Sequence, residues 1–331
     1  MTENNIDEMV SKLMAGDRRM LARTITLVEN EREGHHEVMR QVYPHTGKAM
    51  IVGITGAGGA GKSTLTDLLI TKFRKQGKTV GVMLVDPSSP FTGGAMLGDR
   101  IRMKKHARDQ GVYIRSIASR GAMGGLSRAT YDIIRVIEAF GVDIVIVETL
   151  GTGQDEIDII HLAHTCLVVF TPGMGDDIQA MKAGIMEIAD LIIMNKADLE
   201  GAETFIRHLR GAITAANIPK GAWVPKVLPT VCVSDKPANI TGQDEVIDSI
   251  FEHYNFLQKA KVLDKIKFER LELELGLILR DELQNLIFKG MKGTGLKRKY
   301  ISSIIEGEND PYSVVREILD IYVLHKKKIE K

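Results

Sequence analysis

The sequence is poor in cysteine, with only Cys166 and Cys232 among 331 residues. Both lie in apolar runs typical of strands, so we expect buried, reduced thiols rather than a disulfide or a metal site. The chain also lacks an apolar stretch of the ~18 to 20 residues that a membrane-spanning helix requires. Its first residues, Thr2 to Asn5, are polar and acidic, unlike a secretory or mitochondrial leader. These absences predict a soluble, unprocessed cytoplasmic protein.

An excess of charge of one sign is also absent. Lysine and arginine number 44, and aspartate and glutamate number 43, which gives a formal net charge of +1. A chain so balanced has no overall field to attract nucleic acid or an anionic membrane, and such a partner would need a local patch. We therefore expect neither partner.

The apolar pattern divides the chain into three regions. Residues 1–45 have helical spacing, residues 46–250 alternate short apolar runs with amphipathic stretches, and residues 251–331 are helical. Continuous apolar strands separated by helices indicate an α/β fold with a mostly parallel sheet covered on both faces. The expected strands are Ala49–Thr55, Val80–Val85, Val112–Ile117, Ile144–Val147, Cys166–Thr171, Leu191–Met194 and Val227–Val233.

The clearest motif is a phosphate-binding loop between the first expected strand and an amphipathic helix. The pattern G-x-x-x-x-G-K-[ST] is matched by Gly56, Ala57, Gly58, Gly59, Ala60, Gly61, Lys62 and Ser63. Glycines let the backbone N–H groups turn inward and form an anion site at the start of the helix. We expect Lys62 to reach the β and γ phosphates, Ser63 to bind Mg²⁺, and Thr64 to contact the nucleotide.

A second motif indicates that the nucleotide is GTP. Asn195, Lys196 and Asp198 form N-K-x-D after an expected strand. The Asp198 carboxylate can accept hydrogen bonds from both guanine N1–H and the exocyclic amine, a pair of donors that adenine lacks on that edge. Asn195 and the stem of Lys196 would brace the loop and the base. We also expect Ser234 to contribute to the nucleotide site.

Three acidic residues are candidates to complete the magnesium site that begins at Ser63. Asp86 and Glu148 follow expected strands, and Asp99 lies in a glycine-rich stretch. Carboxylates at strand ends beside a phosphate loop are placed to hold Mg²⁺ directly or through water. An aspartate before a proline can also cap a turn, and this alternative applies to Asp86.

The segment Glu148 to Gly151 has the spacing of the D-x-x-G sensor of the γ phosphate, with glutamate in place of aspartate. The Gly151 N–H would contact that phosphate. The next residue is Thr152, where Ras-like enzymes have the glutamine that orients water, and Gln154 comes two positions later. We therefore expect slow intrinsic hydrolysis that a partner or a loop rearrangement accelerates.

Further stretches resemble one specific family, the MeaB/ArgK G proteins, which are metallochaperones of adenosylcobalamin-dependent acyl-CoA mutases and include the human methylmalonic aciduria type A protein. The resemblance covers nearly the whole chain. It is carried by residues 85–94, 97–100, 119–121, 124–126, 147–149, 175–184 and 310–313.

The resemblance implies a GTPase of the SIMIBI class whose C-terminal helices form a homodimer. It also implies a cobalamin mutase as partner, with GTP gating the delivery of adenosylcobalamin from an adenosyltransferase. Residues 86–99, 148–155 and 173–182 resemble three switches, and Lys182 is the residue we expect to move toward the nucleotide. The family reads Glu-Thr-Val-Gly-Val-Gly-Gln-Ser-Glu at the second switch, whereas this chain has Leu150, Thr152 and Asp155. These differences leave the identity of the mutase open.

Two other functions remain open. One is a kinase that phosphorylates a transport protein, although no substrate base or substrate site can be identified. The other is a nickel-type metal-insertion GTPase, which would need cysteine or histidine ligands near the switches. His161 and His164 are three residues apart, but no cysteine accompanies them nearby, so a place on a helix face or in the core is favoured.

Overall fold

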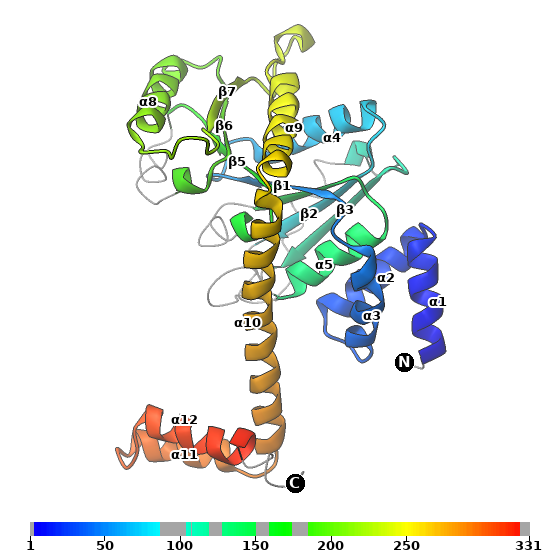
Figure 1. Ribbon diagram of the computed structural model, residues 1–331, viewed down its shortest axis with the longest axis vertical. Coiled ribbons are helices and arrows are strands. Elements are labelled where there is room, and N and C mark those ends of the chain that lie inside the picture. The colour runs from blue at the N-terminus through cyan, green and yellow to red at the C-terminus, as the bar shows by residue number, and fades with distance from the viewer. Residues whose placement is uncertain are drawn as a thin grey trace. The chain divides into compact units, whose positions relative to one another are not determined.

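The computed structural model describes residues 3–86, 104–106, 108–118, 128–149, 159–173 and 185–324 (Figure 1). The chain forms two compact units, Met1–Arg270 and Leu271–Lys331, and the division falls within one long helix. The first unit contains the sheet and is the larger of the two. Among the site residues predicted above, Asp99, Gly151 and Lys182 lie outside the described residues, as does most of each predicted switch.

The first unit is built on a seven-stranded sheet with the order β3-β2-β4-β1-β5-β6-β7. Every pair of neighbouring strands is parallel, which confirms the predicted α/β fold. Because all strands run the same way, their carboxyl ends and the loops that follow lie along one edge. The strands are β1 (Met50–Thr55), β2 (Val80–Asp86), β3 (Val112–Ala118), β4 (Ile144–Thr149), β5 (Thr165–Phe170), β6 (Leu191–Asn195) and β7 (Lys226–Thr230).

Helices cover both faces of the sheet, which is why its central strands are apolar throughout rather than alternating. Helices α4 (Lys62–Lys75) and α9 (Gln243–Lys259) lie side by side and share one apolar core with the strands (Figure 1). Val82 belongs to that core, whereas a Cβ at Gly81 would meet Ile137 of α5 (Arg128–Ala139). Successive strand residues face opposite ways, so α5 covers the other face.

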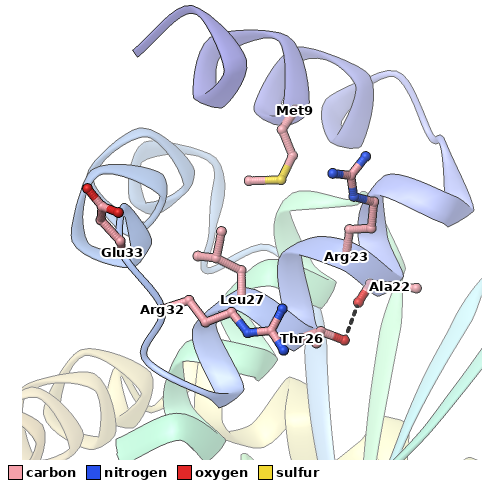
Figure 2. Close-up of a pocket in the computed structure, with 7 residues that line it drawn as sticks. All are labelled: Met9, Ala22, Arg23, Thr26, Leu27, Arg32 and Glu33. Carbon is pink, nitrogen blue, oxygen red and sulfur yellow. Dashed lines mark hydrogen bonds between the residues drawn. The ribbon is translucent and has the colours of Figure 1, made fainter. Parts of the chain in front are cut away.

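Three N-terminal helices lie beside α5 (Figure 1): α1 (Glu3–Met14), α2 (Arg18–Glu29) and α3 (His35–Val42). α2 and α3 pack against α5, and α1 packs on α2 and α3. Asp17 caps α2 by accepting hydrogen bonds from the N–H groups of Arg19 and Met20. Arg18 donates to three backbone carbonyls at the start of β3, which ties α2 to the sheet edge. A cavity of about 500 Å³ lies among α1, α2 and the turn before α3, and Figure 2 shows its lining residues.

The remaining helices are α8 (Ala202–Ala215), α10 (Val262–Met291), α11 (Leu296–Ile305) and α12 (Pro311–Leu319). The second unit has a small core of its own, in which Met291, Tyr300 and Val314 are buried. Asp310 caps α12 by accepting from the N–H groups of Tyr312 and Ser313. No helix among the described residues is long and apolar enough to cross a bilayer.

Candidate nucleotide-binding site

The predicted phosphate loop, residues 56–61, joins β1 to α4 at the carboxyl edge of the sheet. Two of its glycines are required by close approaches. A Cβ on Gly56 would lie 2.2 Å from the Val169 carbonyl oxygen, and one on Gly61 would lie 2.2 Å from Asn195 Nδ2. Both also have positive φ, 134° and 93°, which L side chains rarely adopt. The loop therefore fits against β5 and β6 only because these positions carry no side chain.

Lys62, the first residue of α4, folds back over the loop. Its Nζ donates to the carbonyl oxygens of Gly56 at 2.5 Å and Ala57 at 3.0 Å, and the residue is only 5% exposed. An ammonium group has three donors in a compact geometry, so it can exchange a carbonyl for a phosphate oxygen without leaving its place. This arrangement puts a buried cation at the phosphate loop.

Ser63 and Glu148 meet beside the loop. Ser63 Oγ donates to Glu148 Oε1 at 2.6 Å, and Thr66 Oγ1 donates to Oε2 at 2.7 Å. Glu148, near the end of β4, is completely buried. A hydroxyl and a carboxylate are hard oxygen ligands of the kind that Mg²⁺ prefers, so this pair fits the metal that the motif implies. Asp86 ends the neighbouring β2, so its backbone reaches the same edge.

The N-K-x-D residues contact the phosphate loop directly. Asn195 Nδ2 donates to the Ala60 carbonyl oxygen at 2.8 Å, and Thr230 Oγ1 donates to Asn195 Oδ1 at 3.3 Å. Lys196 has a positive φ of 55°, and its Nζ donates to the Gly59 carbonyl oxygen at 3.1 Å. These bonds join the end of β6 to the loop that follows β1.

A cavity of about 230 Å³ opens beside these contacts, and five predicted residues line it: Gly61, Thr64, Asn195, Lys196 and Asp198. Predicted Ser234 is not among its lining residues, and Ser234 Oγ accepts a hydrogen bond from the Lys236 N–H at 3.3 Å. The described residues that line the cavity are Gly61, Thr64, Asn195, Lys196, Asp198, Leu199, Val231, Cys232 and Val233. Burial raises the pKa of the Cys232 thiol to about 11, so this wall of the cavity is neutral.

The sequence reasoning missed several of these residues. Val231, Cys232 and Val233 line the cavity although they were expected to lie within a strand, because β7 ends at Thr230 and Val231 instead pairs with Thr241. Thr66 was also missed. Its position three residues after Ser63 was a usable signal, because residues i and i+3 share a helix face.

Of the two histidines considered for nickel, His164 has a local hydrogen-bond partner. His164 Nδ1 accepts a hydrogen bond from the Ile51 N–H at 3.0 Å, and burial lowers the pKa of His164 to about 4. His161 ends a single turn of 3-10 helix. Within the part of the chain that the structure describes, no group of three or more histidine, cysteine, aspartate or glutamate side chains is placed to hold a metal ion.

The chain matches the family described as methylmalonyl Co-A mutase-associated GTPase MeaB over residues 21–292. It belongs to the MeaB family. This confirms the resemblance drawn from the sequence, and relatives named as GTPases make the chain a P-loop GTPase that binds guanine nucleotide.

Relatives of this MeaB-family chain match along almost its whole length. A Pyrococcus abyssi protein described as a candidate GTPase is 46% identical over 95% of this chain and 96% of its own. GTPase ArgK of Escherichia coli is 31% identical, with 96% of each chain covered. The mitochondrial methylmalonic aciduria type A homolog of Caenorhabditis elegans is 30% identical over 93% of this chain and 80% of its own.

A solved structure agrees on the fold of the MeaB-family chain. A crystal structure titled LAO/AO transport system kinase is 25% identical, covers 97% of this chain and 98% of its own, and superposes with a TM-score of 0.69. Although that title contains the word kinase, the MeaB family and GTPase ArgK are named as GTPases. The comparisons therefore do not favour the kinase alternative.

Proposed function

We propose that this GTPase is a chaperone of an adenosylcobalamin-dependent acyl-CoA mutase such as methylmalonyl-CoA mutase. It gates delivery of adenosylcobalamin to the mutase, from an adenosyltransferase, and protects or reactivates the mutase. The observation that carries the proposal is the match over residues 21–292 to a family described as associated with methylmalonyl-CoA mutase. The name of the Caenorhabditis elegans relative, a methylmalonic aciduria type A homolog, supports the same role.

In this proposal the loop N–H groups of residues 56–63 and Lys62 bind the phosphates of GTP. Lys62 exchanges its bonds to the Gly56 and Ala57 carbonyls for bonds to the β and γ phosphates. The base lies in the cavity lined by Thr64 and Asp198, where Asp198 accepts from guanine N1–H and the exocyclic amine. Asn195 and Lys196 hold the loop against the base pocket. Ser234 remains a proposed contributor to the base site.

Ser63 and Glu148 would hold Mg²⁺, with Asp86 and Asp99 as further carboxylates. The direct bond of 2.6 Å between Ser63 Oγ and Glu148 Oε1 shows that hydroxyl and carboxylate converge on one point. If Mg²⁺ is bound, these oxygen ligands would hold it at the phosphate loop, and it would supply positive charge that offsets the negative charge developing on the phosphates during hydrolysis. Glu148 would also hold the Ser63 hydroxyl in the orientation that exposes its lone pair.

Slow intrinsic hydrolysis follows from Thr152, which stands where a water-orienting glutamine is found in Ras-like enzymes. In the proposal, the Gly151 N–H contacts the γ phosphate and Lys182 moves toward the nucleotide when the mutase binds. Mutase binding thereby completes the catalytic arrangement, and the nucleotide acts as a timer of cofactor transfer.

The region 251–331 is the proposed dimerisation region. In the second unit, Leu275 is 65% exposed, Leu279 61% and Leu286 38%. Each residue of an α-helix is rotated by about 100° around the helix axis from the one before it. Leu279 and Leu286, which come 4 and 11 positions after Leu275, therefore point within about 40° of Leu275, and the three leucines form one stripe along α10. A solvent-exposed leucine stripe on a helix is the pattern of a helix–helix contact, and a second copy of the chain is the occupant we propose.

Co-isolation tests the proposed partner. The tagged protein is purified from its native cell with GDP, with a non-hydrolysable GTP analogue, and without nucleotide, and a cobalamin mutase is sought by mass spectrometry. Asp198→Asn provides a control, because its guanine-dependent signal should disappear. Recovery of a mutase whose amount depends on the nucleotide supports the proposal. The proposal is contradicted if a mutase is recovered in none of the three states.

A further inference from the structure

Thr66 carries a hydroxyl into an apolar part of α4. The residue is fully buried, and its neighbours Leu65, Leu69 and Ile70 belong to the main core. Burying a hydroxyl is unfavourable unless it is hydrogen-bonded, and threonine is a weaker helix former than leucine or alanine. Packing and helix propensity would both favour an aliphatic residue at this position. The presence of threonine therefore calls for a partner.

That partner is Glu148. Thr66 Oγ1 donates to Glu148 Oε2 at 2.7 Å, while Ser63 Oγ donates to Oε1 at 2.6 Å. Ser63 and Thr66 are three residues apart and share one face of α4, so two hydroxyls on one helix hold the two oxygens of one carboxylate. Thr66 is branched at Cβ. The branching restricts its χ1 angle and so limits the directions in which Oγ1 can point.

We propose that Thr66 is a positioning residue of the magnesium site. By holding Oε2, it keeps the Glu148 carboxylate turned so that Oε1 faces the Ser63 hydroxyl, where the ion would bind. The inference rests on the magnesium role proposed above for Ser63 and Glu148. A glutamate has one more rotatable bond than the aspartate usual in D-x-x-G, so its carboxylate needs more restraint to keep one orientation.

A purely structural role for Thr66 makes a different prediction. If the hydroxyl only compensated a buried carboxylate, its removal would weaken folding and nucleotide binding equally with and without Mg²⁺. A positioning role predicts a loss that appears only when Mg²⁺ is present, because partners behind metal ligands mainly affect metal affinity. The two roles are therefore separated by measuring nucleotide binding in both conditions.

The test uses Thr66→Val, which keeps the shape but loses the hydroxyl, and Thr66→Ser, which keeps the hydroxyl. Thr24→Val is the matched control, since Thr24 is a fully buried helical threonine whose hydroxyl has no hydrogen-bond partner among the described residues. Release of a fluorescent GDP analogue is followed while Mg²⁺ is titrated, and GDP affinity is measured in EDTA. We expect Thr66→Val to need about tenfold more Mg²⁺ for half-maximal slowing of release. For Thr66→Ser and Thr24→Val, the Mg²⁺ concentration for half-maximal slowing should remain within about twofold of the wild-type value. The GDP affinity measured in EDTA should not change in any of the three variants.

The proposal is overturned if Thr66→Val leaves the Mg²⁺ requirement unchanged, if it weakens GDP binding equally in EDTA, or if Thr66→Ser loses as much as Thr66→Val. Thr66→Ala gives a second version of the test should valine prevent folding, and GDP binding in EDTA shows that each variant is folded. A wild-type protein whose GDP release ignores Mg²⁺ would instead refute the magnesium role itself. The two failures are thus distinguishable.

Discussion

At the scale of single residues, Asp198 and Glu148 are carboxylates with opposite surroundings. Asp198 is exposed and lines an open cavity, so it can accept hydrogen bonds from an incoming base. Glu148 is fully buried and both its oxygens accept from hydroxyls. The exposed residue therefore suits recognition of the base, and the buried one suits the metal.

Asp198→Asn should lower GDP affinity by about 10- to 100-fold, because the carboxylate that accepts two donors is replaced by a neutral amide. Xanthine has a carbonyl where guanine has its exocyclic amine, so the asparagine N–H₂ should improve the relative affinity for xanthosine diphosphate. Equilibrium titration with fluorescent nucleotides measures both values. Glu200→Gln, an exposed neighbour that does not line the cavity, is the control. An unchanged GDP affinity in Asp198→Asn would refute the assignment of the base pocket.

Asp190 lies away from this site and predicts a pH effect on stability. Burial raises the pKa of Asp190 from 3.8 to about 7. A hydrogen bond that Asp190 Oδ2 accepts from the Cys166 N–H at 2.8 Å acts in the opposite direction and lowers the pKa, but its effect is smaller. The folded state therefore binds this proton more tightly than the unfolded state. The stability that Asp190 contributes is complete below pH 3.8 and is lost as the pH rises through 7.

Asp190→Asn keeps an acceptor for the Cys166 N–H but cannot become charged. We compare the free energy of unfolding of the variant with that of the wild type. The variant should gain about 1 kcal/mol on the wild type when the pH is raised from 5 to 8, because only the wild type loses stability there, and this value is already reduced to allow for solvent access to Asp190. Urea unfolding at both pH values measures the difference. Burial also lowers the pKa of His164 and His253 to about 4, so in the folded protein both histidines are neutral at pH 5 and at pH 8 and do not titrate across this range. An equal difference at both pH values would contradict the prediction.

At the scale of elements, the strands were predictable because both faces of the sheet are covered. β1, β4, β5 and β6 are buried at every position, which gives the continuous apolar runs read from the sequence. The phosphate loop was predictable because its motif is local. Contacts between distant segments were not. Thr230 bonding to Asn195 and Thr66 bonding to Glu148 depend on strand order, which a pattern along the chain does not specify.

The loop between β1 and α4 allows a matched test of glycine. Gly61→Ala would place a Cβ 2.2 Å from Asn195 Nδ2 at a residue with φ of 93°, so it should destabilise the protein by about 2 kcal/mol or more and weaken GDP binding. The Cβ of Gly211→Ala, in α8, would meet no atom of the described residues within 4 Å, so this variant should stabilise the protein by about 0.5 to 1 kcal/mol. Thermal unfolding and GDP titration measure both effects. Equal stability of the two variants would contradict the proposed close fit.

At the scale of the whole molecule, the chain joins a nucleotide-binding unit to a small helical unit with its own core. The exposed leucines of α10 belong to the second unit, whereas the described residues that contact nucleotide in the proposal belong to the first. A dimer made through α10 would therefore leave the nucleotide chemistry of each copy intact. Assembly and nucleotide binding can be tested separately.

Leu275→Glu combined with Leu279→Glu should convert a dimer into a monomer, because charge would replace apolar surface at the proposed contact. Gln284→Glu is the matched control. It adds one negative charge, half of what the double variant adds, to α10 at an exposed residue nine positions after Leu275, which is half a turn away from Leu275. Sedimentation velocity measures the mass in solution. A double variant that stays dimeric would refute the leucine stripe as the contact.

The most direct test of the central claim is single-turnover GTP hydrolysis with and without a purified adenosylcobalamin-dependent acyl-CoA mutase of the same organism. Alone, the protein should hydrolyse GTP slowly, on the order of 10⁻⁴ to 10⁻² s⁻¹, as GTPases do without an activating partner. Added mutase should raise the rate in a saturable manner. A rate for the isolated protein as fast as that of partner-activated Ras, or a rate that no concentration of mutase changes, would contradict the account.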